Sequence, residues 1–332
     1  MPFLQGVLEP WFEVVYAEQI DAALVRDAVA LLVRTRTRCD AALLAGSAVE
    51  YIGTATIGHD HIDTDYCRRR GIQVTAAAGS NARAVLQYVA SALAHLARRD
   101  GWRPEEKTLG VVGLGHVGSL VAELGQSCGF RVIGCDPPRM RRDPALGFVS
   151  FEELSAGADI VTFHVPLNRS GADRTAGMAD SSFFERLRPG ATLINSSRGG
   201  VIDQQALKKA LRSGKLATAV LDVWENEPAI DPALAALTTL GTMHIAGYSV
   251  QGKANASAMV VQALAKKFGI PLTGWYPPGV PPQVIGPMPD WPTLQQTIDI
   301  HFNITDDDRR LHDHLDQFET LRNEYIYRTE YF

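Results

Sequence analysis

The sequence predicts an α/β protein with two doubly wound parallel-sheet domains and a small C-terminal region. Three observations support this. Short apolar runs alternate with helical segments, the alternation occurs in two series, and a glycine-rich turn, VVGLGHVG (111–118), follows the first run of the longer series. Parallel strands that helices cover on both faces give nearly continuous apolar runs of this kind.

The first series lies at the start of the chain and alternates strand-like with helix-like segments. Strands are expected at 27–35, 48–56 and 72–78, and helices at 20–29 and 64–70. A long helix over 82–99 is expected to lead into the second series.

The second series contains the glycine-rich turn. Its runs are rich in β-branched residues, and six strands with helical crossovers make a doubly wound sheet. The strands are expected at 108–113, 131–136, 159–165, 192–197, 217–223 and 241–246, with helices at 119–128 and 204–213 among the connections.

The rest of the chain is expected to be mostly helical. A helix is predicted over about 252–268, and the stretch TGWYPPGVPPQVIGPMPDWP (273–292) is interpreted as a linker or arm because of its prolines. The last forty residues look helical and charged.

Composition excludes several classes of function. The 332 residues include Lys+Arg 32 and Asp+Glu 37, a net charge of −5 that gives no sign of a basic face for nucleic acid. No apolar run approaches the ~20 residues of a membrane span, and the N-terminus lacks the basic start of a signal peptide. The four cysteines have no metal-like spacing, so we expect free buried thiols, no metal site and a cytoplasmic location.

The glycine-rich turn carries the pattern of a dinucleotide site. Gly113 allows a tight turn, Gly115 lets the backbone approach a pyrophosphate, and Gly118 lets helix and strand pack closely. Asp136 ends the next predicted strand, about 20 residues further on, as expected for a ribose-binding carboxylate. A carboxylate there would repel a 2′-phosphate, which favours NAD over NADP.

Three residues at or near the ends of later strands suggest the chemistry. Arg198 suits a carboxylate, His244 suits proton transfer near neutral pH, and Glu227 suits the other ring nitrogen of that histidine. Taken singly, each has a structural explanation, but together they are what oxidation of a 2-hydroxy acid needs. Asp222 is expected to face the nicotinamide amide.

With these residues identified, nearly the whole chain resembles the D-isomer-specific 2-hydroxyacid dehydrogenases. The segments that carry the resemblance are YIGTATIGHDHID (51–63), AAGSNARAVLQYV (77–89), CDPPR (135–139), LDVWENEP (221–228) and HIAGYSVQGKA (244–254). The resemblance implies a flavodoxin-like substrate domain (1–81 and 247–272), an NAD-binding Rossmann domain (82–246) and a C-terminal dimerisation region (273–332). A homodimer is therefore expected.

The resemblance also implies roles for matched positions. Arg198, Glu227 and His244 match catalytic residues, and Arg34, Thr35, Thr56 and Tyr248 match substrate-binding ones. The expected NAD-binding residues are Gly113, Gly115, His116, Val117, Gly118, Asp136, Val165, Ser196, Ser197, Arg198, Asp222 and Gly247.

The substrate is expected to be a phosphorylated 2-hydroxy acid. The stretch VRTRTR (33–38) places three arginines at a predicted strand end, and Arg34 and Thr35 match the family pattern. Lys253 is a second candidate for the phosphate, and a solvated basic loop explains Arg36 and Arg38 equally well. Two alternatives stay open: a family member acting on another 2-hydroxy acid, and an NAD-sensing binding protein on the same scaffold.

The chain departs from the family pattern in places. Compared with that pattern, it lacks a strand before Met1, its segment VVYAEQIDAAL (14–24) is shorter, and it stops before the end of the usual dimerisation region. Val165, Met243 and Ser80 replace a hydroxyl residue, a proline and a cysteine. None of these changes removes a catalytic group.

Overall fold

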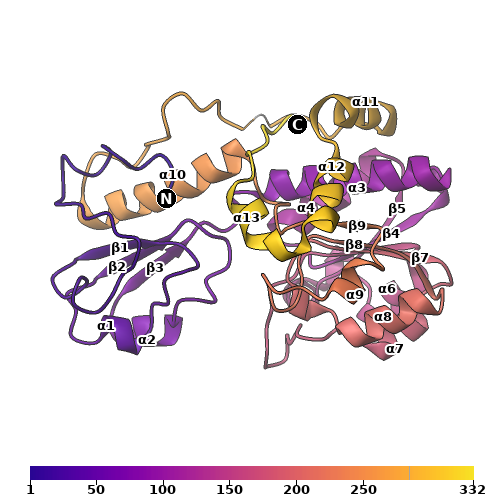
Figure 1. Cartoon of the computed structure of the whole chain (residues 1–332), viewed down its shortest axis with the longest axis horizontal. Helices are drawn as coiled ribbons and strands as arrows, with labels where there is room; N and C mark the ends of the chain where they lie inside the picture. The colour runs from indigo at the N-terminus through magenta and orange to yellow at the C-terminus, as the bar shows by residue number, and fades with distance from the viewer. Residues whose placement is uncertain (284) are drawn as a thin grey trace. The chain divides into compact units, whose positions relative to one another are not determined.

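The computed structural model describes residues 1–283 and 285–332, which divide into two compact units (Figure 1). The first unit contains Met1–Asn81 and Ser249–Gln283. The second contains Ala82–Tyr248 and residues 285–332, which we call the tail. Of the expected C-terminal region, 273–283 belongs to the first unit and 285–332 to the second.

The first unit contains a three-stranded parallel sheet in the order β1-β2-β3. Helix α10 lies along one face of this sheet, and α1 and α2 lie on the other (Figure 1). The elements are β1 (Ala30–Val33), α1 (Ala41–Leu44), β2 (Tyr51–Thr54), α2 (Thr64–Arg69), β3 (Gln73–Ala76) and α10 (Val250–Phe268).

Strand β2 and helix α10 pack closely because β2 contains a glycine. A Cβ on Gly53 would lie 2.4 Å from Cγ1 of Val260, so a larger residue would push the helix away. The buried hydroxyl of Tyr51 donates to the carbonyl oxygen of Val260 at 3.1 Å. This contact joins residues far apart in the sequence and makes α10 part of the first unit.

The helix expected over 20–29 is wrong, because these residues form turns. Only Val25 is buried there, whereas Leu24 and Val29 are exposed. A short helix is stable only when enough of one face packs against the rest of the protein, and here Val25 alone is fully buried, with Ile20 and Ala28 partly buried beside it.

The second unit is built on a six-stranded parallel sheet in the order β5-β4-β6-β7-β8-β9, which confirms the predicted doubly wound architecture. The strand order reverses between β4 and β6, and ligands bind at the carboxyl ends of strands at such a point. The strands are β4 (Thr108–Val112), β5 (Arg131–Cys135), β6 (Ile160–Phe163), β7 (Ala191–Asn195), β8 (Leu216–Leu221) and β9 (Leu240–Gly241).

Helices cover both faces of this sheet. In Figure 1, α3 and α4 lie on one face, and α6, α7 and α8 lie on the other. The helices are α3 (Ala82–Asp100), α4 (His116–Ser127), α5 (Pro137–Arg142), α6 (Phe151–Gly157), α7 (Ser181–Arg186), α8 (Gln204–Arg212) and α9 (Pro232–Ala235), with 3₁₀ turns η1 (Pro104–Glu106), η2 (Pro144–Leu146) and η3 (Gly199–Val201).

The tail packs on the second unit through three helices. Trp291 at the start of the tail stacks on Trp102 with a centroid distance of 6.2 Å, and the amide of Gly241 in β9 donates to Asp308 at 2.7 Å. The tail contains α11 (Trp291–His301), α12 (Ile304–Asp313), η4 (Leu315–Gln317) and α13 (Phe318–Asn323). No helix among the described residues is long and apolar enough to cross a membrane.

The last strand is shorter than expected. The sequence predicts a strand over 241–246 with His244 near its exit, but β9 ends at Gly241. His244 has a φ of 58°, which is incompatible with extended backbone. The amides of Ile245 and Ala246 bind the carboxylate of Asp222 instead of a neighbouring strand. We call residues Thr242–Ala246 the histidine loop.

Candidate active site

The glycine-rich turn joins β4 to α4. Gly113 has a φ of +84°, and a Cβ there would lie 2.7 Å from the carbonyl oxygen of His164. A Cβ on Gly118 would lie 1.8 Å from the carbonyl oxygen of Gly113, so the helix starts this close to the strand only without a side chain. Around Gly115 there is open space within 4 Å, as a ligand approaching the backbone requires.

The first turn of α4 supplies amides for an anionic ligand. The helix begins at His116, directly after Gly115. The first amides of a helix have no acceptor within the helix, and the helix dipole favours negative charge at this end. The predicted contacts His116 and Val117 therefore lie where a phosphate would be bound.

Asp136 lies at the carboxyl end of β5, as the sequence predicts. One carboxylate oxygen accepts from the amide of Leu114 at 2.9 Å, and the other accepts from the amide of Arg139 at 2.9 Å. Asp136 therefore connects the glycine-rich turn to the start of α5, and it stands beside the turn as a ribose-binding carboxylate must.

Arg139, which was not predicted from the sequence as a site residue, also contacts the glycine-rich turn. Its guanidinium donates to the carbonyl oxygen of Leu114 and, at 3.3 Å, to the hydroxyl of Ser119, and it lies over the ring of Phe148. The motif CDPPR (135–139) offered a signal, since an arginine three residues after Asp136 falls in the first turn of α5.

Two serines follow β7 at the same edge of the sheet. The hydroxyl of Ser197 donates to Asn195 at 2.8 Å, whereas the buried hydroxyl of Ser196 has no hydrogen-bond partner among the residues that the structure describes. Leaving a buried hydroxyl unpaired is costly, so a ligand that bonds to it fits the site. Together with the open space beside Gly115, this supports a dinucleotide at this edge. The predicted contact Val165 lies two residues after the end of β6.

Arg198 follows these serines and precedes η3. Its Nη1 donates to the carbonyl oxygen of Ser197 at 2.7 Å. A Cβ on the next residue, Gly199, would lie 2.0 Å from the carbonyl carbon of Trp224. The loop after β7 thus lies directly on the loop after β8, which brings Arg198 and Glu227 to one cavity.

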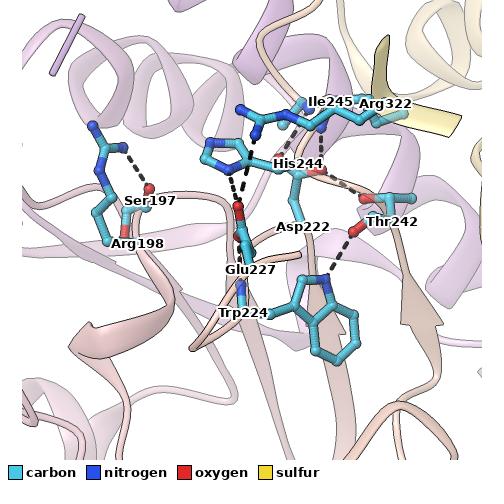
Figure 2. Close-up of polar contacts among 10 residues, drawn as sticks. Ser197, Arg198, Asp222, Trp224, Glu227, Thr242, His244, Ile245 and Arg322 are labelled. Carbon is cyan, nitrogen blue, oxygen red and sulfur yellow. Dashed lines mark hydrogen bonds and ion pairs between the residues drawn. The ribbon is translucent and has the colours of Figure 1, made fainter. Parts of the chain in front are cut away.

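Glu227 and His244 form a hydrogen-bonded pair (Figure 2). Nδ1 of His244 lies 2.7 Å from Oε2 of Glu227, and the amide of Trp224 donates to Oε1 at 2.9 Å. A carboxylate only accepts hydrogen bonds, so Nδ1 carries the proton and Nε2 is the nitrogen left for a substrate. Burial raises the pKa of Glu227, but the hydrogen bond and charge of His244, the Trp224 amide and Arg322 outweigh burial and leave that pKa lowered.

The histidine loop is held by Asp222, which is 1% exposed. One carboxylate oxygen accepts from the hydroxyl of Thr242 at 2.7 Å and from the amide of Ile245 at 2.8 Å, and the other accepts from the amide of Ala246 at 2.9 Å. A positive φ in a residue with a side chain costs roughly 1–3 kcal/mol and persists only where neighbours enforce it. Asp222 is one such neighbour of His244, and its predicted contact with the cofactor stays a prediction.

A cavity of about 660 Å³ contains all three predicted catalytic side chains, Arg198, Glu227 and His244. Arg169 and Arg174, from the loop between β6 and α7, line the same cavity. No motif in the sequence singled them out, although they follow a predicted strand end as Arg198 does. The cavity therefore presents three guanidinium groups around an acid–histidine pair, which suits an anionic substrate.

The predicted substrate residues of the first unit follow two adjacent strands. Arg34 and Thr35 come after β1 and are exposed, and Thr56 comes shortly after β2. The hydroxyl of Thr56 donates to the carbonyl oxygen of Gly58 at 2.8 Å and lies 2.7 Å from the hydroxyl of Thr54. Because β1 and β2 are parallel, these residues gather at one edge of the sheet.

Tyr248, which the resemblance assigns to the substrate, lies among tail residues of the second unit. Its ring packs edge-on against Tyr325 and Tyr327 at centroid distances of 6.1 and 5.7 Å. Arg322 of α13 lies 5.9 Å from the same ring and 4.0 Å from Oε2 of Glu227. Nothing in the sequence singled out Arg322. Gly247 precedes Tyr248 and is partly buried.

Comparison with known proteins identifies the family. A sequence model of the D-isomer specific 2-hydroxyacid dehydrogenases, NAD binding domain, matches residues 72–246. An erythronate-4-phosphate dehydrogenase of Bacteroides fragilis is 43% identical over 333 residues, which cover 99% of this chain and 95% of the relative. The enzyme of the same name from Cronobacter sakazakii is 40% identical over 341 residues, covering 100% and 90%.

Solved structures agree with this result. The crystal structure of D-lactate dehydrogenase from Aquifex aeolicus, complexed with NAD and lactic acid, superimposes with a TM-score of 0.66 at 25% identity. The match covers 84% of this chain and 96% of that one. The chain belongs to the D-isomer specific 2-hydroxyacid dehydrogenase family.

Proposed function

We propose that the protein catalyses the NAD-dependent oxidation of 4-phospho-D-erythronate to 2-oxo-3-hydroxy-4-phosphobutanoate, a step of pyridoxal 5′-phosphate (vitamin B6) biosynthesis. The observation that carries the proposal is the His244–Glu227 pair, 2.7 Å apart, in one cavity with Arg198. The choice of substrate is supported by relatives named erythronate-4-phosphate dehydrogenase, which align over nearly the whole chain at 40–43% identity.

The residues divide the chemistry between them. Bound NAD supplies an acceptor for the hydride that leaves C2. His244 accepts the proton of the C2 hydroxyl at Nε2 and becomes an imidazolium, which the carboxylate of Glu227 stabilises. Arg198 binds the C1 carboxylate through its guanidinium and thereby orients C2. The products are the 2-oxo acid, NADH and one proton.

NAD is expected at the glycine-rich turn. The amides at the start of α4 would hold the pyrophosphate, Asp136 the ribose hydroxyls, and the unpaired hydroxyl of Ser196 a further polar group. The carboxylate of Asp136 beside the turn favours NAD over NADP, since a 2′-phosphate there would meet a like charge.

The phosphate of the substrate is assigned to Arg34 and Thr35 of the first unit. Both are exposed at a strand end, where a guanidinium and a hydroxyl would be accessible to a phosphate. Arg169 and Arg174 of the second unit are the competing candidates, because they line the cavity of the catalytic residues.

A substrate comparison tests the proposal. NADH formation should be much faster with 4-phosphoerythronate than with 3-phosphoglycerate or unphosphorylated erythronate. A preference for 3-phosphoglycerate or hydroxypyruvate would instead indicate a phosphoglycerate dehydrogenase or hydroxypyruvate reductase. Binding of NAD without turnover of any 2-hydroxy acid would support an NAD-sensing binding protein.

The same assay locates the phosphate site. Arg34→Ala should lower kcat/KM for 4-phosphoerythronate at least about tenfold, because a charge-assisted hydrogen bond contributes ~1.5–3 kcal/mol. It should barely change the slow oxidation of erythronate, which has no phosphate. If Arg169→Ala or Arg174→Ala gives this pattern and Arg34→Ala does not, the phosphate binds in the second unit.

We further propose a homodimer that forms through the tail after about Pro289, in the cytoplasm. The tail is too short to bury a core of its own, and the chain resembles a dimeric group of the family. Light scattering of the full chain should give the mass of two chains. A dimer that persists after removal of the residues beyond 289 would contradict this role of the tail.

A further inference from the structure

The end of the tail reaches the backbone of the histidine loop through a buried arginine. Arg328 is 9% exposed, and its Nη1 donates to the carbonyl oxygen of Ile245 at 3.1 Å. Its Nη2 donates to the carbonyl oxygen of Ala246 at 2.5 Å and to that of Ala84 in α3 at 3.3 Å. One guanidinium therefore binds the two residues that follow His244.

These contacts complement those of Asp222. Asp222 accepts from the amides of Ile245 and Ala246, and Arg328 donates to the carbonyl oxygens of the same two residues. Both the N–H and the C=O groups of the two residues after His244 are thus hydrogen-bonded to a charged side chain. The left-handed φ of His244, 58°, makes such restraint necessary, because relaxation of the loop would rotate the imidazole away from Glu227.

We propose that Arg328 is a positioning residue for His244, so that the C-terminal tail is part of the catalytic apparatus. This inference rests on the proposed role of His244 as the proton acceptor. Arg328 touches neither the imidazole nor Glu227 in any contact described above. It acts through the loop backbone, and its loss should slow the chemical step while the cofactor still binds.

The surroundings of Arg328 fix its guanidinium in one orientation. The group stacks over the ring of Phe302 at 4.3 Å, and Nη1 also donates to the hydroxyl of Tyr325 at 3.2 Å. That hydroxyl in turn donates to Asp307 of α12 at 3.1 Å. A planar fork held in this way donates to several carbonyl oxygens in fixed, well separated directions, whereas the three donors of a lysine all lie on one nitrogen and reach a smaller area.

Other tail residues contact the same region independently. Arg322 lies 4.0 Å from Glu227, the partner of His244, and Tyr325 and Tyr327 pack against Tyr248. The tail thus meets the backbone after the histidine, the carboxylate that orients it and the tyrosine that follows it. All these contacts lie within the second unit.

The test compares Arg328→Met with Arg98→Met in the full-length protein. Arg98 also joins the tail to α3, through an ion pair with Asp299 and a hydrogen bond to the carbonyl oxygen of Gln295, but it does not contact the histidine loop. Arg328→Met should lower kcat about 10- to 100-fold, because displacement of a catalytic group by about 1 Å has effects of this size. Arg98→Met should keep the wild-type kcat.

Binding measurements separate positioning from loss of fold. Arg328→Met should bind one NAD per chain with an unchanged Kd, with KM for the 2-hydroxy acid nearly unchanged. A kcat within about twofold of wild type would overturn the inference, as would a loss of kcat matched by an equal loss of NAD-binding stoichiometry.

A conservative variant covers the case in which Arg328→Met does not fold. Arg328→Lys keeps the charge and can reach one carbonyl oxygen, so kcat should fall less than in the methionine variant while NAD still binds. Wild-type kcat in Arg328→Lys would then overturn the inference. Failure of the wild type to oxidise 4-phosphoerythronate would count against the proposed substrate only, and the comparison would be made with whichever 2-hydroxy acid the wild type oxidises.

Discussion

The glycine-rich turn and the histidine loop each contain a residue in the left-handed backbone conformation, but they stabilise that conformation in different ways. Both follow strands of one sheet, and both contain a residue with positive φ, 84° at Gly113 and 58° at His244. In the turn, Gly113 can adopt the positive φ because it has no Cβ, and α4 can start close to β4 because Gly118 has none. In the loop, a histidine must adopt it, and distant residues hold it there. A cofactor site can therefore be encoded locally, whereas the conformation of His244, the proposed proton acceptor, depends on contacts with Asp222 and the tail.

The largest effect should come from breaking the locally encoded turn. In Gly118→Ala the new Cβ would lie 1.8 Å from the carbonyl oxygen of Gly113, so the start of α4 must move and NAD binding should be lost. Gly115→Ala is the matched control, because open space surrounds that position within 4 Å. It should keep the wild-type melting temperature. Tight NAD binding by Gly118→Ala, measured by fluorescence titration, would show that the turn tolerates displacement.

Asp136 tests how far the turn depends on a residue outside it. Asp136→Ala should weaken NAD binding about 10- to 100-fold, the effect of losing a charge-assisted hydrogen bond, and should relax discrimination against NADP. Asp136→Asn keeps an acceptor for the Leu114 amide, so it should retain more NAD affinity while also accepting NADP. Titration of each variant with NAD and with NADP measures both affinities. Unchanged affinities for both cofactors in the alanine variant would show that Asp136 does not contribute to cofactor binding.

Thr242 tests the histidine loop in the same manner. Its buried hydroxyl donates to Asp222 at 2.7 Å and lies 2.8 Å from the hydroxyl of Tyr88. Thr242→Val removes both contacts at similar volume, so the free energy of unfolding should fall by about 1–3 kcal/mol. We expect kcat to fall roughly tenfold as the loop loosens. Tyr88→Phe, which removes only the outer contact, should have less effect, and wild-type kcat in Thr242→Val would mean that Asp222 alone suffices.

The smallest expected effect concerns how the tail is attached near β9. Nδ1 of His312 lies 3.2 Å from the Asp308 carboxylate, and Nε2 lies 3.0 Å from the carbonyl oxygen of Ala235. Both partners are acceptors, so the imidazole is doubly protonated. The hydrogen bond to Asp308 raises the pKa of His312 to about 9 although burial lowers it.

The sign of the pH dependence follows from that shift. The pKa in the folded state, about 9, lies above the ordinary value of 6.5, so the stabilisation is fully present below pH 6.5 and is lost as the pH rises through 9. Chemical denaturation should show the free energy of unfolding falling over this range, and less so in His312→Gln. Identical pH dependence in the two proteins would contradict the assignment.

Local patterns were enough to predict most of the second unit. The apolar runs place β4 through β8 close to their bounds, because strands buried on both faces leave an uninterrupted signal. Because β7 and β8 were placed correctly, Arg198 and Glu227 are also confirmed to follow strand ends. The two side chains share a cavity with His244.

The sequence could not show what depends on distant contacts. The run 241–246 looks like a strand, but Asp222 takes the amides that would continue it. Residues 20–29 have helical composition, but Val25 is the one fully buried side chain among them, which is too little packing to stabilise a short helix. The approach of Arg328 to Ile245 joins positions 83 residues apart, for which one sequence offers no periodic signal.

Hydride transfer in His244→Asn tests the central claim most directly. The wild type and the variant are mixed with NAD and 4-phosphoerythronate in a stopped-flow instrument, and NADH absorbance is followed through one turnover. The loss of a general base typically lowers rates ~10²–10⁴-fold, so the variant should form NADH that much more slowly while binding NAD with the wild-type Kd. Wild-type rates of NADH formation in His244→Asn would contradict the account.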